Sequence, residues 1–184
     1  MRAAAALLCA ALAAACSSAG EPMSDWERRH PELLGTPAST ALPVPPAMPR
    51  KENLIEFYVG PTASFRYFID AASLSVFYKQ KEVRYVLVAR SPSGVENVSF
   101  EAIRCPDMHR TFAVGDAGGK WSVRPSDWQA IQSRTALGWP SVLARQFFCP
   151  HRDPIQSAAE GVNALRLGAH PLVYVEQRPG PASP

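Results

Sequence analysis

Short apolar and β-branched runs, separated by turn-forming residues, dominate the chain between residues 54 and 114. In the run at 83–90, Val83, Tyr85 and Leu87 alternate with a second set of side chains that has arginine at both ends. Such alternation predicts a central strand with one wholly apolar face. Similar runs predict strands at 55–59, 65–69, 74–78, 95–103 and 111–114. Because short connections rich in turn formers join them, an antiparallel meander is expected.

The C-terminal third contains residues that typically start and end helices. Ser126 is placed to cap a helix at 127–133, and Pro140 is placed to open a second helix at 141–148. A third helix is predicted from Asp153 to about Leu167, because Pro154 follows the cap and Gly168 follows the end.

Together these patterns predict one α+β domain at 53–178, an antiparallel meander sheet with C-terminal helices packed on one face. Within the third helix, Gly161 is expected to weaken the helix by about 1 kcal/mol relative to alanine. A short edge strand is expected at 172–175, and a disordered tail at 179–184.

The N-terminus has a different apolar pattern. After Met1 and Arg2 comes an unbroken apolar run of 13 residues, from Ala3 to Ala15. A helix that spans a bilayer needs about 20 such residues. A positive start, an apolar core of this length and small residues before the cut are the parts of a secretory signal peptide. We therefore predict that residues 1–15 are a signal peptide and that the protein is exported.

The end of this run, Leu12-Ala13-Ala14-Ala15-Cys16, resembles the lipobox of bacterial lipoproteins, although alanine at 13 stands where leucine is more common. The resemblance implies that Cys16 carries acyl chains such as palmitate, which anchor a protein stably when two or more act together. Ser17 implies forwarding to the outer membrane, with the protein facing the periplasm. The alternative is an ordinary Ala-x-Ala cut that leaves a soluble periplasmic protein.

A proline-rich segment follows the predicted anchor. Residues 17–52 contain seven prolines and show no sustained helical or strand period. Such a segment favours extended polyproline geometry at about 3.1 Å per residue, so we read 16–52 as the lipidated N-terminus and a tether. A short helix around Trp26 and Leu33 that packs on the domain is the alternative.

Charge and length restrict the partners. The precursor has a net charge of +3, and its basic residues are scattered rather than clustered. A phosphate-binding stripe for nucleic acid needs clustering, so no nucleic-acid partner is expected. A domain of this size can bury an ordinary core without a metal or a second chain, and a monomer is expected.

Two cysteines, Cys105 and Cys149, remain in the domain once Cys9 leaves with the signal and Cys16 is acylated. Export to an oxidising compartment and an even count favour a disulfide between them. One alternative is a zinc site that adds His109 and His151, although neither spacing is a standard one. A second alternative, a nucleophilic pair of Cys149 and His151, lacks an orienting group.

Other motifs favour structural interpretations. The segment 116–120, Asp-Ala-Gly-Gly-Lys, lacks the spacing of a phosphate loop and is better explained as a hairpin turn. Trp121, Trp128 and Trp139 favour core or edge packing over a sugar-stacking platform. No catalytic triad or paired carboxylate stands out, and no cofactor is expected.

Five segments of the domain together form a recognisable pattern: Phe68 to Val76, Val83 to Ser91, Gly94 to Cys105, Gly119 to Trp121 and Phe147 to Cys149. This pattern resembles the cryptic-neisserial-protein-like (CNP-like) family of small exported proteobacterial proteins. The resemblance covers roughly residues 55 to 165, and the family's pattern pairs the cysteines that match Cys105 and Cys149. It implies export and a single domain, and it implies no activity.

We therefore expect a lipoprotein of the cell envelope that acts as a non-enzymatic binding or structural module, with an envelope protein or glycan as its partner. The alternative is a periplasmic hydrolase of envelope material. A deep pocket that brings together His109, Asp107, His151 and Arg104 would favour the hydrolase.

Overall fold

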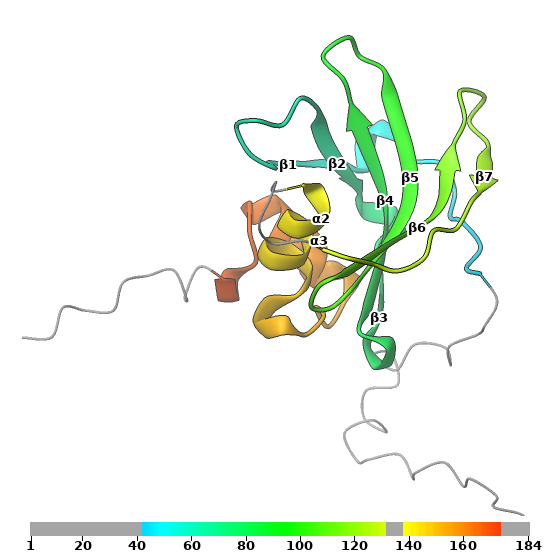
Figure 1. The fold of residues 1–184 in the computed structure, drawn as a ribbon. Coiled ribbons are helices and arrows are strands. Elements are labelled where there is room, and N and C mark those ends of the chain that lie inside the picture. Colours follow the sequence, from blue (N-terminus) through cyan, green and yellow to red (C-terminus); the bar gives the residue numbers. More distant parts are fainter. Residues whose placement is uncertain (1–41, 132–137, 174–184) are drawn as a thin grey trace, which may run out of the picture.

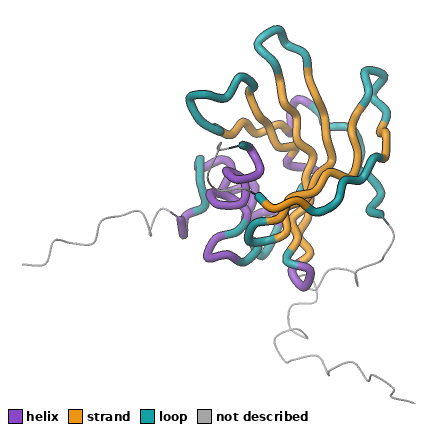
Figure 2. The backbone as a smooth tube through the Cα atoms, viewed as in Figure 1, coloured by secondary structure: helices purple, strands orange, loops and turns teal. Residues whose placement is uncertain are grey.

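The structure is a computed structural model, and it describes residues 42–131 and 138–173. The predicted signal peptide, Cys16, the tether up to residue 41, residues 174–178 and the tail at 179–184 lie outside the described residues. Figure 1 shows a twisted sheet with helices gathered on one side of it, and Figure 2 separates the two kinds of element by colour. The predicted α+β class, with C-terminal helices on one face of an antiparallel sheet, is confirmed.

The sheet is antiparallel, with the strand order β1-β2-β4-β5-β6-β7; β3 also pairs with β4, and β8 pairs with β6. The strands are β1 (Leu54–Phe57), β2 (Arg66–Asp70), β3 (Ser75–Phe77), β4 (Glu82–Arg90), β5 (Glu96–Arg104), β6 (Met108–Gly115), β7 (Trp121–Val123) and β8 (Gln129–Ala130). A short 3-10 turn, η2 (Lys51–Asn53), precedes β1, and two others, η3 (Ala71–Ser73) and η4 (Tyr78–Gln80), link β2 to β3 and β3 to β4. The six strands predicted between residues 55 and 114 are each in place to within a few residues. The sheet departs from a simple meander at one point, because β2 pairs with β4 and β3 pairs with the other end of β4.

The central strand β4 divides the interior into two cores. Val83, Tyr85 and Leu87 point to the side of the helices and join the larger core, whereas Val86 belongs to a smaller core on the other side. We call these two sides of the sheet the helix face and the open face. The predicted alternation along 83–90 is confirmed, because the residues that alternate with the apolar set include Arg84 and Arg90.

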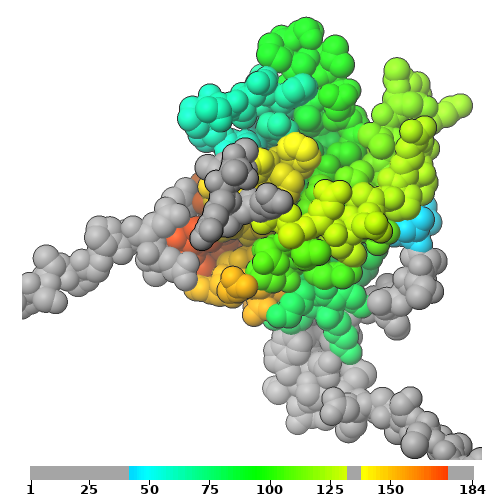
Figure 3. All heavy atoms as spheres, in the orientation of Figure 1, coloured from blue at the N-terminus to red at the C-terminus, as the bar shows by residue number. Residues whose placement is uncertain are grey.

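The helical layer begins with α2 (Trp139–Val142), which continues as a π-helical segment, η5 (Leu143–Phe148). A π-helix is wider than an α-helix because its hydrogen bonds span five residues; here the Cys149 amide donates to the carbonyl of Ala144 at 2.9 Å. The short turn η6 (Pro150–Arg152) leads to α3 (Ala158–Leu167). The space-filling view in Figure 3 shows these yellow and orange segments against the green sheet. None of the helices in the described part of the chain is long and apolar enough to cross a bilayer.

One helix prediction and one strand prediction need correction. Instead of a helix at 127–133, Gln129 and Ala130 form β8 and pair with Met108 and His109, because the exposed edge of β6 offers free backbone groups. Of the edge strand predicted at 172–175, residues 172 and 173 lie instead in a helical turn, and residues 174 and 175 lie outside the described residues.

The third helix starts later than Asp153. Its N-cap is Ser157, whose hydroxyl accepts from the Glu160 amide, while Asp153 is in extended conformation. Its predicted end is confirmed, because Gly168 adopts a left-handed conformation at the C-cap. Inside the helix, a Cβ on Gly161 would lie 2.6 Å from atoms of both Ile155 and Leu74. The missing side chain therefore allows close packing, and the expected gain from alanine does not apply here.

The ordered contacts of the domain begin before residue 53. Residues 42–50, which the sequence assigns to the tether, lie along the open face of the sheet. The Trp121 indole donates to the carbonyl of Pro46 at 2.7 Å, and the Met48 side chain lies beside Val98 and Gly115. The end of the proline-rich segment is thus part of the folded domain.

Candidate functional site

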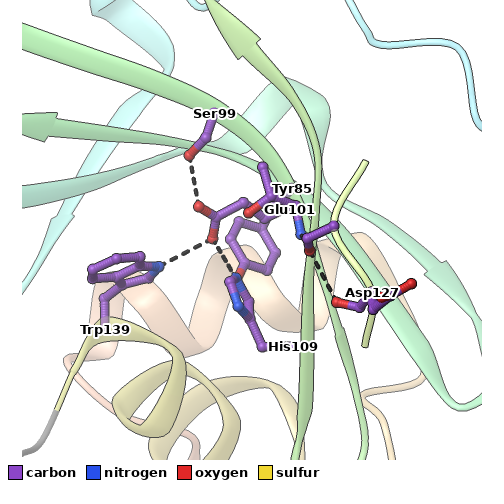
Figure 4. Close-up of polar contacts among 8 residues, drawn as sticks. Tyr85, Ser99, Glu101, His109, Asp127 and Trp139 are labelled. Carbon is purple, nitrogen blue, oxygen red and sulfur yellow. Dashed lines mark hydrogen bonds and ion pairs between the residues drawn. The ribbon is translucent and has the colours of Figure 1, made fainter. Parts of the chain in front are cut away.

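A buried carboxylate, Glu101, lies at the centre of the most connected cluster of polar side chains. It is on β5 and points to the helix face, between the sheet and α2, as Figure 4 shows. Only 2% of its surface is exposed. An ionised carboxylate at this depth is unfavourable unless hydrogen-bond donors compensate its charge.

Four side chains donate to Glu101. Its Oε1 accepts from the Ser99 hydroxyl at 2.6 Å. Its Oε2 accepts from the Tyr85 hydroxyl at 3.1 Å and from the Trp139 indole at 3.0 Å. The His109 Nε2 lies 2.9 Å from the same oxygen and must carry a proton, since an ionised carboxylate can only accept. The donors come from β4, β5, β6 and α2, so the cluster ties three strands to the helical layer.

The pKa of Glu101 follows from two opposed effects. Burial raises the pKa, but the hydrogen bond and charge of His109, with the bonds from Ser99 and Trp139, lower it, and the net pKa lies below the ordinary glutamate value. Burial raises the pKa of the Tyr85 phenol well above its usual range, and the neighbouring Glu101 charge raises it further. The pair is therefore an ionised acid beside a neutral phenol.

This arrangement limits what Glu101 can do chemically. A general acid needs a proton to give, and a lowered pKa leaves Glu101 without one near neutral pH. A nucleophile or base needs an oxygen free to approach a substrate, whereas the oxygens of Glu101 are already engaged by four donors. The cluster is suited to holding the helices on the sheet.

Aromatic rings enclose the cluster on its helical side. Trp139 stacks on Tyr67 with ring centroids 5.6 Å apart, and the His109 ring meets Trp139 edge-on at 6.3 Å. These contacts fix the indole so that its N–H points at Glu101. The predicted packing role of Trp139 is confirmed in this form.

The second feature of the helix face is the cysteine pair. The sulfur atoms of Cys105 and Cys149 lie 2.02 Å apart, which is bonding distance for a disulfide, and the Cα atoms are 5.6 Å apart. The pairing that the sequence predicts agrees with this geometry. Because sulfurs bonded to each other supply no thiolate, the zinc and nucleophile alternatives lose their cysteine ligand and their attacking group. Among the described residues, no group of three or more metal-binding side chains is arranged to hold an ion.

A cavity of about 650 Å³ opens beside the disulfide. Its lining includes Asp107, Arg145, His151 and Arg152. His151 and Arg152 both have positive φ, at 51° and 70°, a left-handed conformation that is uncommon outside glycine. The volume is in the range of small-molecule sites.

The structure brings together only part of the set that the hydrolase hypothesis requires. Asp107 and His151 line the cavity. His109 instead points into the Glu101 cluster, and Arg104 lies over Trp128 on the open face. The four residues therefore do not converge.

The remaining motifs have structural roles. Residues 116–120 form the hairpin between β6 and β7, where the Asp116 side chain accepts from the amides of Gly118 and Lys120, so the predicted hairpin is confirmed. Trp121 and Trp128 pack against the smaller core, as expected.

Sequence reasoning missed Glu101. One signal was available: on the predicted strand at 95–103, Glu101 shares a face with Ile103 and not with Phe100, and an acidic residue on an apolar face implies buried partners. Those partners come from segments 16 and 38 residues away, for Tyr85 and Trp139, and no local pattern identifies them.

Comparisons with known proteins give one finding. No curated protein and no solved structure matches the chain. A family model described as the CNP1-like family matches residues 38–166, a range that includes all of residues 42–50, Cys105 and Cys149, and Glu101. Since this match covers well over half of the 184 residues, the chain belongs to the CNP1-like family.

Proposed function

We propose that this protein is a lipoprotein of the cell envelope, anchored through Cys16 at the periplasmic face of the outer membrane, and that its domain is a non-enzymatic binding module. The anchor is supported by the signal peptide and lipobox patterns of residues 1–16. The partner is an envelope protein or glycan within reach of the tether.

The observation that supports a non-enzymatic role is the burial and hydrogen bonding of Glu101. Among the acidic residues that the structure describes, Glu101 is the most deeply buried, and its oxygens accept from donors of the protein itself. Enzymes usually keep such a group accessible to a substrate. Here it stabilises the domain and leaves the outer surfaces for binding.

The anchor is tested by replacing Cys16 with Ser and fractionating cells after a high-salt wash, which removes proteins attached by charge alone. We expect the wild-type protein in the outer-membrane fraction and the variant in the soluble periplasmic fraction. Unchanged fractionation of Cys16→Ser would refute lipidation.

The binding role is tested by crosslinking in intact cells and recovery of the protein under denaturing conditions. A partner recovered with the wild-type chain, at levels well above its abundance, supports the proposal. Recovery of abundant bystanders alone counts against it.

The cavity beside the disulfide favours a second candidate, a hydrolase of envelope material, because Asp107 and His151 both line it. This candidate predicts that purified protein releases soluble fragments from isolated envelope material. It also predicts that Asp107→Asn abolishes the release without lowering the melting temperature, and release by the variant at the wild-type rate would exclude Asp107 as the acid or base.

A further inference from the structure

The open face of the sheet has different charge balance at its two ends. At one end each arginine has its own carboxylate: Arg66 pairs with Glu56, and Arg90 pairs with Glu96 at 2.6 Å. Two positive charges meet two negative charges there. Such an end has little net attraction for a charged partner.

The opposite end is unbalanced. Arg84 and Arg104 share one carboxylate, Glu82, at distances of 2.6 and 3.3 Å. Among the described residues, Arg110 has no ion pair with any acidic side chain. These three arginines, which we call the arginine cluster, therefore leave an excess of two positive charges over Glu82.

Register on the sheet places the arginine cluster on one surface. Arg84 lies opposite Ala102, and Ala102 lies opposite Arg110 on the next strand. Arg104 lies opposite Glu82. Each of the three lies two positions along its strand from a residue of the smaller core, namely Val86, Ala102 and Phe112. Side chains two apart on a strand share a face, so all three arginines leave the sheet on the open face.

Aromatic rings hold the guanidinium groups in place. The Arg84 guanidinium lies 3.9 Å from the ring centre of Phe77, and that of Arg104 lies 4.0 Å from Trp128. The Arg110 guanidinium is within 5.1 Å of the Phe112 ring centre and 5.8 Å of Trp128. A stacked guanidinium keeps its charge and loses less rotational freedom when its edge meets an anion. The Arg104 side chain remains 43% exposed.

The chain enters the domain on the same face. Residues 42–50 lead from the tether, and Figure 1 shows this cyan segment beside β7, on the side of the sheet away from α2 and α3. Pro46 and Met48 contact the open face, as described above. Two apolar side chains of the segment point outward, with Leu42 43% and Val44 88% exposed.

From these observations we infer that the open face, through the arginine cluster, docks the domain on an anionic phospholipid surface. The arginines bind headgroup phosphates, and Leu42 and Val44 contact the boundary of the acyl chains. The inference rests on the proposed function, because the acylated Cys16 is what brings this face to a membrane. A basic residue near an anionic surface contributes about 1 kcal/mol to the free energy of membrane binding. The arginine cluster therefore provides a second attachment to the membrane besides the lipid anchor.

The test uses the mature chain from residue 16 with Cys16→Ser, which contains the tether and the domain but no acyl groups. Its partition is measured on vesicles of phosphatidylethanolamine mixed with phosphatidylglycerol, and on vesicles of phosphatidylcholine alone. We expect binding to the anionic vesicles that falls steeply with added salt, and no binding to the neutral ones. Equal binding to both vesicles, or no binding to either, would overturn the inference.

Variants locate the contact. The double variant Arg104→Gln/Arg110→Gln is expected to lower the partition coefficient about 25-fold, from about fivefold per arginine. Arg84 remains to pair with Glu82, and unchanged melting temperature shows that the variant folds. The matched control is Arg145→Gln/Arg166→Gln, which removes the same charge from exposed residues of the helical layer. It is expected to change binding less than about twofold, because those charges lie beyond the screening distance from the surface.

Two outcomes would contradict membrane docking at this place. Equal losses in the two double variants would assign the binding to net charge. Competition by inorganic phosphate, at concentrations where chloride of the same ionic strength has no effect, would assign a small-anion site instead. If Arg104→Gln/Arg110→Gln unfolds, Arg110→Lys replaces it and must retain most of the binding. These results are independent of acylation, so the docking and the anchor can fail separately.

Discussion

The two faces of the sheet differ in how completely their charged side chains are paired. On the helix face, the carboxylate of Glu101 is buried and matched by four donors, and a cysteine pair at disulfide distance joins β5 to the end of η5. On the open face, the small core around Phe100 and Val86 is bordered by arginines that outnumber their carboxylates. The buried charge on the first face is matched by donors within the protein, whereas the arginines of the second face exceed their carboxylates.

This difference suggests that the helix face stabilises the fold and that the open face binds partners. Buried polar groups that are fully paired fix a fold, because leaving any one of them unpaired is costly. Charges that exceed their partners at a surface cost little there and attract opposite charge from outside. We therefore expect substitutions on the helix face to affect stability strongly, and substitutions on the open face to affect interactions more than stability.

The largest expected effect on the helix face comes from the cysteines. The pair closes a separation of 44 residues. In the chain-entropy model, loss of such a link lowers the free energy of unfolding by about 4 kcal/mol. We expect this loss in Cys105→Ala/Cys149→Ala, measured by urea unfolding without reductant. Two free thiols titrating in the untreated wild-type protein would contradict the disulfide, and reductant must leave the double variant unchanged.

The second effect comes from Glu101. In Glu101→Gln the hydrogen bonds of Tyr85, Trp139 and His109 lose the ionised partner, and we expect the free energy of unfolding to fall by about 3 kcal/mol at neutral pH. The matched control is Glu96→Gln on the same strand, which removes an acid from an exposed pair with Arg90. That change is expected to cost less than about 1 kcal/mol.

The pH dependence of Glu101 has a definite sign. Its pKa is lower in the folded protein than the ordinary value of 4.5, so the stability that it supplies is fully present above that value. This stability is lost as the pH falls through the lowered folded pKa. The difference between wild-type and Glu101→Gln should therefore narrow in acid unfolding titrations. A difference that stays constant from neutral pH to well below 4.5 would contradict a charged role for Glu101.

The sheet was predictable from the sequence because its signals are local. Alternation along β4 and the turn residues at 116–120 each specify an element within a few positions. The end of α3 was predictable for the same reason, since Gly168 is the residue that a left-handed cap favours. The cysteine pairing followed from export and an even count.

The parts that the sequence did not predict depend on distant contacts. The helix α3 begins after Ser157 and not after Asp153, because the Ile155 amide donates to the Phe148 carbonyl at 2.9 Å and is not available for a helix that starts at Asp153. Gln129 and Ala130 are not helical, because the edge of β6 pairs with them. The excess of arginine on the open face is invisible in the sequence, where Arg84, Arg104 and Arg110 are scattered and only strand register gathers them.

The smallest expected effect is on the open face, at the bond between Trp121 and Pro46. Trp121→Phe keeps an aromatic ring near Phe100 and removes only the N–H that donates to the Pro46 carbonyl, so the free energy of unfolding should fall by about 1 kcal/mol. Residues 42–50 should then detach more often, and trypsin should cleave after Arg50 faster. The matched control, Trp139→Phe, removes an indole donor from Glu101 on the helix face. It should cost more stability, because it leaves a buried carboxylate short of a donor, but it should not speed cleavage after Arg50 under native conditions. If both variants speed that cleavage equally, the segment is held by global stability rather than by Trp121, and the two faces are less independent than their contacts indicate.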